Sequence, residues 1–160
     1  MLSNAERYRI PVINIVGSQD ANWYPITEDG TQGFMATSKV KIEGLNTWLK
    51  IDGYDMREVS FENSLQLVDR SLNTVESKLG IKVDAARIIR TDTRYYVGDL
   101  LNDQKQNLIR IVLAENVPHM TSANHAAMAW DFMKQFSRDR ASGQLTYVPN
   151  SKSDPDPTTF

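Results

Sequence analysis

The stretch Ile10-Pro11-Val12-Ile13-Asn14-Ile15-Val16-Gly17-Ser18-Gln19-Asp20 decides the fold. Its first seven residues are mostly apolar and β-branched, and Gly17-Ser18 closes the run. A short run of this kind is typical of a buried strand in a parallel sheet, and a proline is tolerated where such a strand begins. The sequence therefore predicts a parallel strand over Pro11 to Val16, followed by a turn that carries Asp20.

Two helices are expected between this strand and the middle of the chain. The first spans about Phe34 to Ile51 and ends before Gly53, and the second spans Ser64 to Leu79 and ends at Gly80. Glycine is a natural residue at a helix C-terminus. Apolar residues recur at helical spacing in both segments. They are Ile42, Leu45, Trp48 and Leu49 in the first helix, and Leu65, Val68, Leu72, Val75 and Leu79 in the second.

The second half of the chain has the composition of β-strands. Apolar and β-branched residues gather at Ile88-Ile89, at Thr93 to Val97 and at Leu108 to Leu113, and the polar residues 102–107 separate the last two runs as a hairpin turn. We expect Leu108 to Leu113 to lie parallel beside the first strand, with Thr93 to Val97 antiparallel at the edge of the sheet.

The chain is expected to close with a helix and a tail. Thr121-Ser122 can cap a helix from Asn124 to Ser137. The apolar side of this helix is expected to face the core. It consists of Ala126, Ala129, Trp130, Met133 and Phe136. Trp130, Phe132 and Phe136 are expected to lie in the core. Residues 149–160 have the composition of a flexible tail, so the expected α/β domain covers residues 1–148.

Composition and charge bear on several classes of function. Eighteen basic and twenty acidic residues give a formal charge of −2 without a long run of one sign, which argues against a nucleic-acid partner. The absence of cysteine excludes disulfides and thiolate metal sites. No run approaches the roughly 18 apolar residues of a membrane span. The chain is therefore expected to be soluble, and secreted only if a longer parent carries a signal peptide.

Two stretches place an ionisable side chain just past the carboxyl end of an expected strand. They are Val16 to Asp20 and Leu113 to His119. Open α/β sheets bind their ligands at this edge. In a serine hydrolase an acid orients a histidine that accepts the proton of the nucleophile, and in the α/β-hydrolase fold the acid precedes the histidine along the chain. We therefore expect a carboxylate oxygen of Asp20 within about 3.5 Å of a His119 ring nitrogen.

Each candidate residue also has a purely structural explanation. Asp20 could cap a turn through its carboxylate, and His119 could be a loop residue bonded to the backbone. His125 competes for the role of the base, although a surface position in the first turn of the last helix explains it as well. Trp23 and Tyr24 could form an apolar wall for a substrate, or pack locally within their loop.

The order and spacing of six stretches resemble the esterases similar to polyhydroxybutyrate depolymerases and feruloyl esterases, within the α/β-hydrolase superfamily. The stretches are Ile10 to Asp20, Gly44 to Gly53, Tyr95 to Asp99, Leu108 to Leu113, Val117 to His119, and Ala129 to Phe136. The resemblance covers about two thirds of the chain. It implies an α/β-hydrolase fold in which Asp20 is the triad acid and His119 the general base.

The chain departs from this family at the nucleophile. It has no Gly-x-Ser-x-Gly motif, and Ser18 precedes the acid, so Ser18 cannot be the nucleophile of this fold. The loop of the oxyanion hole is also absent. We therefore expect the C-terminal portion of an α/β-hydrolase sheet whose N-terminal half is missing. The chain alone is expected to be inactive, with the serine supplied from upstream sequence or from another chain.

Two functions follow from this interpretation. The first is a carboxylic ester hydrolase fragment that contributes the acid and the histidine without a metal or cofactor, and whose partner is the N-terminal half of the fold or a second copy. The alternative is a non-catalytic binding or assembly module derived from the same fold. A zinc site is not expected, because the chain has only two histidines, six residues apart.

Overall fold

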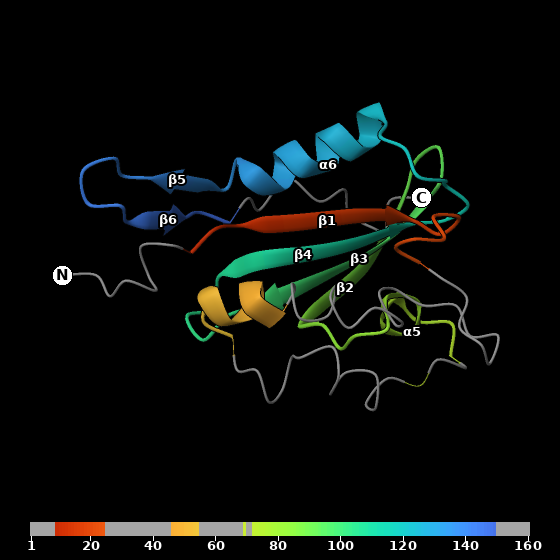
Figure 1. The fold of residues 1–160 in the computed structure, drawn as a ribbon, viewed down its shortest axis with the longest axis horizontal. Helices are drawn as coiled ribbons and strands as arrows, with labels where there is room; N and C mark the ends of the chain where they lie inside the picture. The colour runs from red at the N-terminus through yellow and green to blue at the C-terminus, as the bar shows by residue number, and fades with distance from the viewer. Residues whose placement is uncertain (1–8, 25–45, 55–68, 70–71, 150–160) are drawn as a thin grey trace.

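The computed structural model describes residues 9–24, 46–54, 69 and 72–149. Over these residues the protein is a mixed α/β structure with a four-stranded sheet in the order β1-β4-β3-β2 and a separate pair of strands, β5 and β6 (Figure 1). The strands of the larger sheet are β1 (Val12–Gly17), β2 (Ala85–Arg90), β3 (Arg94–Leu101) and β4 (Asn107–Ala114). The expected α/β class is confirmed at this level.

Strands β1 and β4 are parallel neighbours, as the sequence predicted. Their register runs from Val12 opposite Ile109 to Gly17 opposite Ala114. All eight residues of β4 are buried, which explains its nearly continuous apolar sequence. Because the two strands run in the same direction, their carboxyl ends lie side by side, and the loops that follow them start from one edge of the sheet (Figure 1).

The predicted hairpin is present, but its place in the sheet was predicted wrongly. β3 pairs antiparallel with β4, and the Asn102 side chain organises the turn by accepting hydrogen bonds from the N–H groups of Gln104 and Gln106 at 3.0 and 2.9 Å. The edge is formed by β2, which pairs antiparallel with β3 over all six of its residues. Only the pair Ile88-Ile89 was predicted there, since the flanking alanines and arginines give no strand signal.

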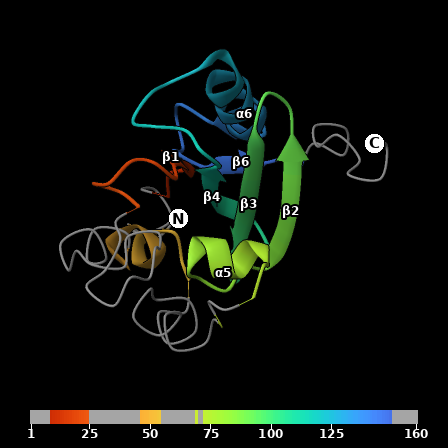
Figure 2. The ribbon, with the colours of Figure 1, turned by 90° about the vertical axis from the view of Figure 1, so that its right-hand side faces the viewer.

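Helices cover both faces of the sheet (Figures 1 and 2). One face carries α6 (Ala123–Met133), and Met128 of this helix packs against a core cluster made of Tyr95, Val97, Val112 and Ala114. The other face carries α5 (Val75–Leu79) and the helical residues 46–51. The larger core cluster includes Leu49, Leu79, Leu100, Leu108, Ile109, Ile111 and Leu113.

The helix predicted over Ser64 to Leu79 is shorter in the described residues. Thr74 has an extended backbone and caps the N-terminus of α5, with its Oγ1 accepting from the Ser77 N–H at 3.1 Å. Ser77 Oγ accepts from the Thr74 N–H at 2.9 Å, which completes a capping box. Leu72 therefore lies before the helix and is exposed. Gly80 ends α5 in the left-handed conformation, as predicted, while 64–68 and 70–71 lie outside the described residues.

The segment 46–54 packs against the start of β1. Leu49 is fully buried, Trp48 is partly exposed, and Gly53 has the positive φ angle of +82° expected where a helix stops. The buried Asp52 carboxylate accepts the Ile10 N–H at 2.9 Å. Burial raises the pKa of Asp52 to about 6, although the hydrogen bond from Ile10 and the charge of Arg9 oppose the rise. The predicted residues Ile42 and Leu45 lie outside the described residues.

The last helix does not bury the side that the sequence predicted. Trp130 is 67% exposed and Met133 is 41% exposed, and Ala126 is exposed as well. The buried residues of α6 are His125 and Phe132, of which Phe132 was correctly predicted to lie in the core. The helical spacing of the apolar residues was recognised correctly, but the side of the helix that faces the sheet was predicted wrongly.

The same helix is also shorter than the predicted range to Ser137. It ends at Met133, and Lys134 caps it. The chain then forms β5 (Phe136–Arg138), which pairs antiparallel with β6 (Leu145–Tyr147). The Phe136 ring stacks on Tyr147 at a centroid distance of 5.1 Å, and this contact favours Phe136 in the strand over a continued helix.

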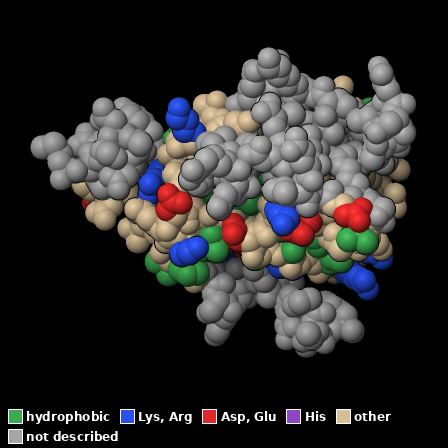
Figure 3. Space-filling view, turned by 90° about the horizontal axis from the view of Figure 1, so that it is seen from below, with side chains coloured by type: hydrophobic (Ala, Val, Ile, Leu, Met, Phe, Trp, Pro, Cys, Tyr) green, Lys and Arg blue, Asp and Glu red, His purple; other side chains and the backbone are tan. Residues whose placement is uncertain are grey.

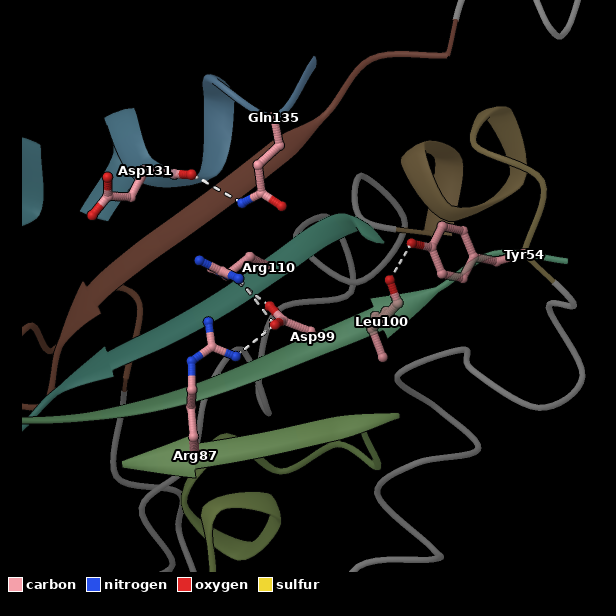
Figure 4. A network of polar contacts seen from close by, with 7 residues as sticks. All are labelled: Tyr54, Arg87, Asp99, Leu100, Arg110, Asp131 and Gln135. Atoms are coloured by element: carbon pink, nitrogen blue, oxygen red, sulfur yellow. Dashed lines mark hydrogen bonds and ion pairs between the residues drawn. The ribbon is translucent and has the colours of Figure 1, made fainter. Parts of the chain in front are cut away.

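A buried ion network lies between the sheet and α6 (Figure 4). Asp99 on β3 accepts two hydrogen bonds from Arg110 on β4, at 2.7 and 3.0 Å, and one from Arg87 on β2 at 2.6 Å. The Arg110 guanidinium lies 5.1 Å from the centre of the Phe132 ring. Burial raises the pKa of Asp99, but the hydrogen bonds and charges of Arg110 and Arg87 outweigh burial and hold the pKa below its usual value.

Charged side chains on the described surface are of mixed sign. In the face shown in Figure 3, the acidic and basic side chains are interspersed. Among the described residues, no helix is long and apolar enough to cross a membrane. The predicted tail lies outside the described residues from position 150 onward.

Because Asp99 is the centre of the ion network, Asp99→Ala is predicted to lower the free energy of unfolding strongly. Removal of the carboxylate breaks the ion pair with Arg87 and takes away the carboxylate that binds the buried Arg110 guanidinium, which costs about 3–5 kcal/mol. Because the folded pKa of Asp99 lies below its unfolded value, the carboxylate stabilises the fold near neutral pH and loses this effect as the pH falls through the folded pKa. Urea denaturation should therefore show the largest difference between wild type and variant at pH 7, and a smaller one below about pH 4.

The matched control is Asp103→Ala, which removes an exposed carboxylate from the turn between β3 and β4. Its effect should stay within about 0.5 kcal/mol. Equal effects of the two variants at pH 7 would contradict a stabilising role of the network.

Candidate active site

Backbone hydrogen bonds join the loops that follow β1 and β4. The Ser18 N–H donates to the Ala114 carbonyl at 2.8 Å, and the Gln19 N–H donates to the Val117 carbonyl at 3.0 Å. Ser18 Oγ accepts the Asn116 N–H at 2.7 Å. The two loops therefore form one unit at the carboxyl edge of the sheet, where the sequence predicted the functional residues.

Gly17 allows this close approach. A Cβ atom at position 17 would lie 2.0 Å from the Val117 carbonyl oxygen and 2.7 Å from the Pro118 carbonyl oxygen. These are backbone atoms, so they cannot move aside without shifting the loop that carries His119. From the sequence, Gly17 was predicted only to end a strand.

Asp20 and His119 are hydrogen-bonded, as the sequence predicted. The Asp20 Oδ2 atom lies 2.6 Å from His119 Nδ1, well inside the expected limit. Two residues 99 positions apart in the sequence thus meet because β1 and β4 are parallel neighbours. The contact itself is confirmed, while the catalytic roles of the two residues remain predictions.

The surroundings of Asp20 favour its ionised form. The carboxyl group is buried, and its Oδ1 atom accepts the Asn22 N–H at 3.1 Å. Burial raises the pKa of Asp20, but the hydrogen bonds from His119 and Asn22, together with the charge of a protonated His119, outweigh burial and lower the pKa below its usual value. Asp20 is therefore a carboxylate at neutral pH and can accept the Nδ1 proton of His119.

The geometry at His119 determines which ring nitrogen can act on a ligand. Its side chain is 77% exposed, in contrast to the 5% exposure of the Asp20 side chain. A carboxylate that accepts the Nδ1 proton leaves Nε2 with a lone pair and fixes the orientation of the ring. Within the described ranges, no serine or threonine hydroxyl is hydrogen-bonded to His119.

A cleft of about 490 Å³ opens beside this pair. Asn14, Ile15, Val16 and Gly17 of β1 form one side of the cleft, and Asp20, Trp23, Pro118, His119, Met120 and Thr121 complete it. β1 is the outer strand of the sheet and pairs only with β4 in the described part of the chain. The cleft therefore runs along β1 toward His119.

The two aromatic residues that were predicted to bind substrate lie in different places. Trp23 lines the cleft, in agreement with a role in its wall. Tyr24 does not line it, because its side chain is buried in the core and its hydroxyl donates to the Lys78 carbonyl at 3.0 Å. For Tyr24 the structure thus supports local packing rather than a substrate contact.

His125 is neither a surface residue nor a lining residue of the cleft. It lies in the first turn of α6, as expected, but it is buried and its ring meets Tyr95 edge-on at a centroid distance of 5.8 Å. Among the described residues, its Nε2 atom has no hydrogen-bond partner, and no group of three or more acidic or histidine side chains is placed to hold a metal ion.

Seven of the ten residues that line the cleft were not predicted as site residues, among them Asn14, Met120 and Thr121. Asn14 lies in the middle of β1, while Met120 and Thr121 follow His119 directly. An amide in an otherwise apolar strand was a visible signal at position 14, because a buried strand seldom carries a polar side chain without a reason. Met120 and Thr121 had no such signal beyond their proximity to His119.

Among the described residues, Asp20 is thus hydrogen-bonded to His119 beside an open cleft, and no serine or threonine hydroxyl is bonded to His119. Such a pair can accept a proton from a hydroxyl group or a water molecule placed near Nε2. Comparisons of the chain with protein-family models, with curated proteins and with solved structures find no match.

Gly17→Ala is predicted to disturb the site and to destabilise the fold. The added Cβ collides with the Val117 backbone, so the histidine loop must shift at a cost of about 1–3 kcal/mol. The free energy of unfolding from urea titration measures this cost, and the NMR signals of the His119 ring report the shift of the loop.

Ser18→Ala is the matched control, since it removes the Oγ acceptor of the Asn116 N–H and adds no atom to the neighbouring position. A cost of about 0.5–1.5 kcal/mol is expected for that hydrogen bond, with little change at the His119 ring. If Gly17→Ala leaves both the stability and the His119 signals unchanged, the close packing of the two loops is not what positions the histidine.

Proposed function

We propose that this chain supplies the acid and the general base of a serine-type carboxylic ester hydrolase, as the C-terminal part of an α/β-hydrolase sheet. The observation that carries the proposal is the 2.6 Å contact between Asp20 and His119 at the carboxyl ends of two neighbouring parallel strands. Acid before histidine along the chain is the order found in this fold. The proposed activity therefore matches the sequence order and the geometry of the same two residues.

The two residues have different tasks in the proposed reaction. His119 Nε2 removes the proton of a serine hydroxyl as that oxygen attacks the ester carbonyl, and it later gives the proton to the leaving alcohol. Asp20 accepts the Nδ1 proton, orients the ring and stabilises its charged form. In the second half of the reaction, His119 activates a water molecule that cleaves the acyl-enzyme and restores the serine.

The cleft indicates where the serine has to come from. Because the cleft is lined by β1, which pairs only with β4 among the described residues, a further parallel strand paired to β1 would end near His119. In an α/β-hydrolase the nucleophile sits on the sharp turn after a strand of the same sheet. We propose that upstream sequence or another polypeptide provides this strand, and the oxyanion hole with it. The N-terminal half of the fold is thus the proposed partner, and association of copies along this strand is the alternative.

The apolar part of the cleft fits an ester better than a charged ligand. Trp23 and Ile15 line the cleft with Met120, while Asn14 and Thr121 add uncharged polar groups. Apolar walls with a few polar groups are typical of sites for small organic ligands. We propose that the acyl group or an aromatic group of the ester lies against Trp23.

One observation favours the alternative, a binding or assembly module that has kept the fold without the chemistry. The Asp20–His119 pair has no hydroxyl partner within the described residues, although the cleft beside it is open. Such a module would bind a ligand in the cleft without turnover, or would pair with another protein along β1.

The proposal predicts that the chain alone has no esterase activity of its own. Its rate of p-nitrophenyl acetate hydrolysis should not exceed that of a reference sample, which contains the His119→Ala variant together with free imidazole. Imidazole is needed as a reference because an exposed histidine can itself attack so activated an ester. A fluorophosphonate probe, which labels activated serines, should leave the chain unlabelled. Co-expression with a polypeptide that carries an in-frame Gly-x-Ser-x-Gly motif and is encoded directly upstream should produce labelling on that polypeptide.

In the complex, His119→Ala should lower kcat/KM by at least about 10³-fold, and Asp103→Ala, in the exposed turn between β3 and β4, should have a small effect. A complex that forms but stays inactive and unlabelled would favour the binding module. Fluorophosphonate labelling of the chain by itself, abolished by His119→Ala, would place a nucleophile within these 160 residues and contradict the proposed division of the site.

A further inference from the structure

The outer side of α6 is apolar along its whole length. Five residues recur at helical spacing, and all five are exposed: Ala123, Ala126, Ala127, Trp130 and Met133. We call this set the α6 stripe. A surface helix normally turns such a stripe toward the core and its charged residues toward water. Here the side turned to the sheet carries His125, whereas the stripe faces outward.

The stripe lacks the charges that keep surface helices apart. The first turn of α6 has no acidic residue and its last turn has no basic residue. Asp131 is the one charged residue between the caps, and it is paired with Lys134 at 2.5 Å beside the stripe. Contact between two apolar surfaces of this kind requires no desolvation of an unpaired charge. Exposed apolar surface of this extent is typical of an interface.

The sizes of the side chains indicate what covers the stripe. The N-terminal half of the stripe consists of alanines, and its C-terminal half consists of Trp130 and Met133. In an antiparallel pair with its twofold axis between Ala126 and Ala127, Trp130 of each copy lies over Ala123 of the other copy. A parallel pair would instead place Trp130 against Trp130 and leave the alanines facing a gap. The stripe is therefore complementary to itself only in the antiparallel arrangement.

We propose that the α6 stripe is the interface of a homodimer, formed by antiparallel packing of α6 from two copies about a twofold axis. Such an interface is isologous, because the same surface serves both partners. Met120 is also exposed, two residues before the N-cap Ser122. In the antiparallel register, Met133 of one copy lies beyond the N-terminus of α6 of the other copy, on the side of the loop that carries Met120.

The proposed contact also reaches the candidate site. Met120 lines the cleft and follows His119 directly, so the end of one α6 lies near the cleft of the second copy. This surface lies over a face of the sheet and differs from the edge of β1, where the N-terminal half of the fold is proposed to pair. The dimer does not depend on the proposed function, and a hydrolase or a binding module could form it.

The size of the stripe sets the expected affinity. Specific interfaces bury roughly 1,200–2,000 Å² in total, and a single pair of three-turn helices lies at or below the low end of this range. We therefore expect a weak dimer with a Kd on the order of 10 µM. Sedimentation velocity of the full chain from about 1 to 200 µM covers this transition. Trp130→Glu should weaken the association at least about tenfold, because a tryptophan in an interface often carries much of its energy and a glutamate would place a charge against the apolar stripe of the other copy.

Leu72→Glu is the matched control, since Leu72 is an exposed apolar residue near α5, on the other face of the sheet. It should leave the sedimentation profile unchanged. Circular dichroism should show both variants folded, because neither side chain is buried. A chain that remains monomeric at 200 µM overturns the proposal, and so does an association that Trp130→Glu leaves unchanged.

Cysteine cross-linking tests the orientation independently, because the chain has no cysteine of its own. In the antiparallel pair, the two copies of residue 127 lie next to the twofold axis, within the Cα separation of about 4.4–6.8 Å that a disulfide needs. The two copies of residue 123 are about 10 Å apart along the axis, from the rise of 1.5 Å per residue. Mild oxidation should therefore cross-link Ala127→Cys and not Ala123→Cys. Equal cross-linking of both variants would indicate a parallel pair and overturn the proposed arrangement.

Discussion

The parallel pairing of β1 with β4 is the constraint on which the rest of the structure depends. It brings the loops that follow the two strands to one edge of the sheet and aligns Gly17 with Ala114. Only a glycine at that position allows the Val117 backbone to approach closely enough for His119 to reach Asp20. The candidate site is thus a consequence of strand direction and of one missing side chain, and the local sequence around the histidine contributes little to it.

The strands and the acid–histidine contact could be predicted from the sequence because their signals are local and strong. The run from Ile10 to Val16 is β-branched and ends in small residues, and Asp20 and His119 each follow a strand. The residues at which the helices begin and end were harder to predict. At Thr74, a side chain that caps the backbone outweighs the apolar spacing and starts α5 late. Ile88-Ile89 likewise gave too little signal for the full edge strand β2.

The side of α6 that faces the sheet could not be predicted from the spacing of its apolar residues, because periodicity identifies an apolar side without saying what covers it. In this protein the surface beneath the helix includes the ion network of Asp99 and Arg110, and Phe132 packs on the Arg110 guanidinium. The apolar stripe around Trp130 is left outside as a result. A buried network formed by three strands has no signature in the sequence, since its members are spread from position 87 to position 110.

The central claim is that Asp20 holds His119 with its proton on Nδ1, which leaves Nε2 free to act as a base. The ¹⁵N and ¹³C chemical shifts of the His119 ring, measured at a pH where the ring is neutral, report the position of this proton most directly. We expect the Nδ1–H tautomer in the wild type, and its loss in Asp20→Asn, whose amide can turn its NH₂ group toward the ring. A wild-type ring with the proton on Nε2, unchanged in Asp20→Asn, would contradict it.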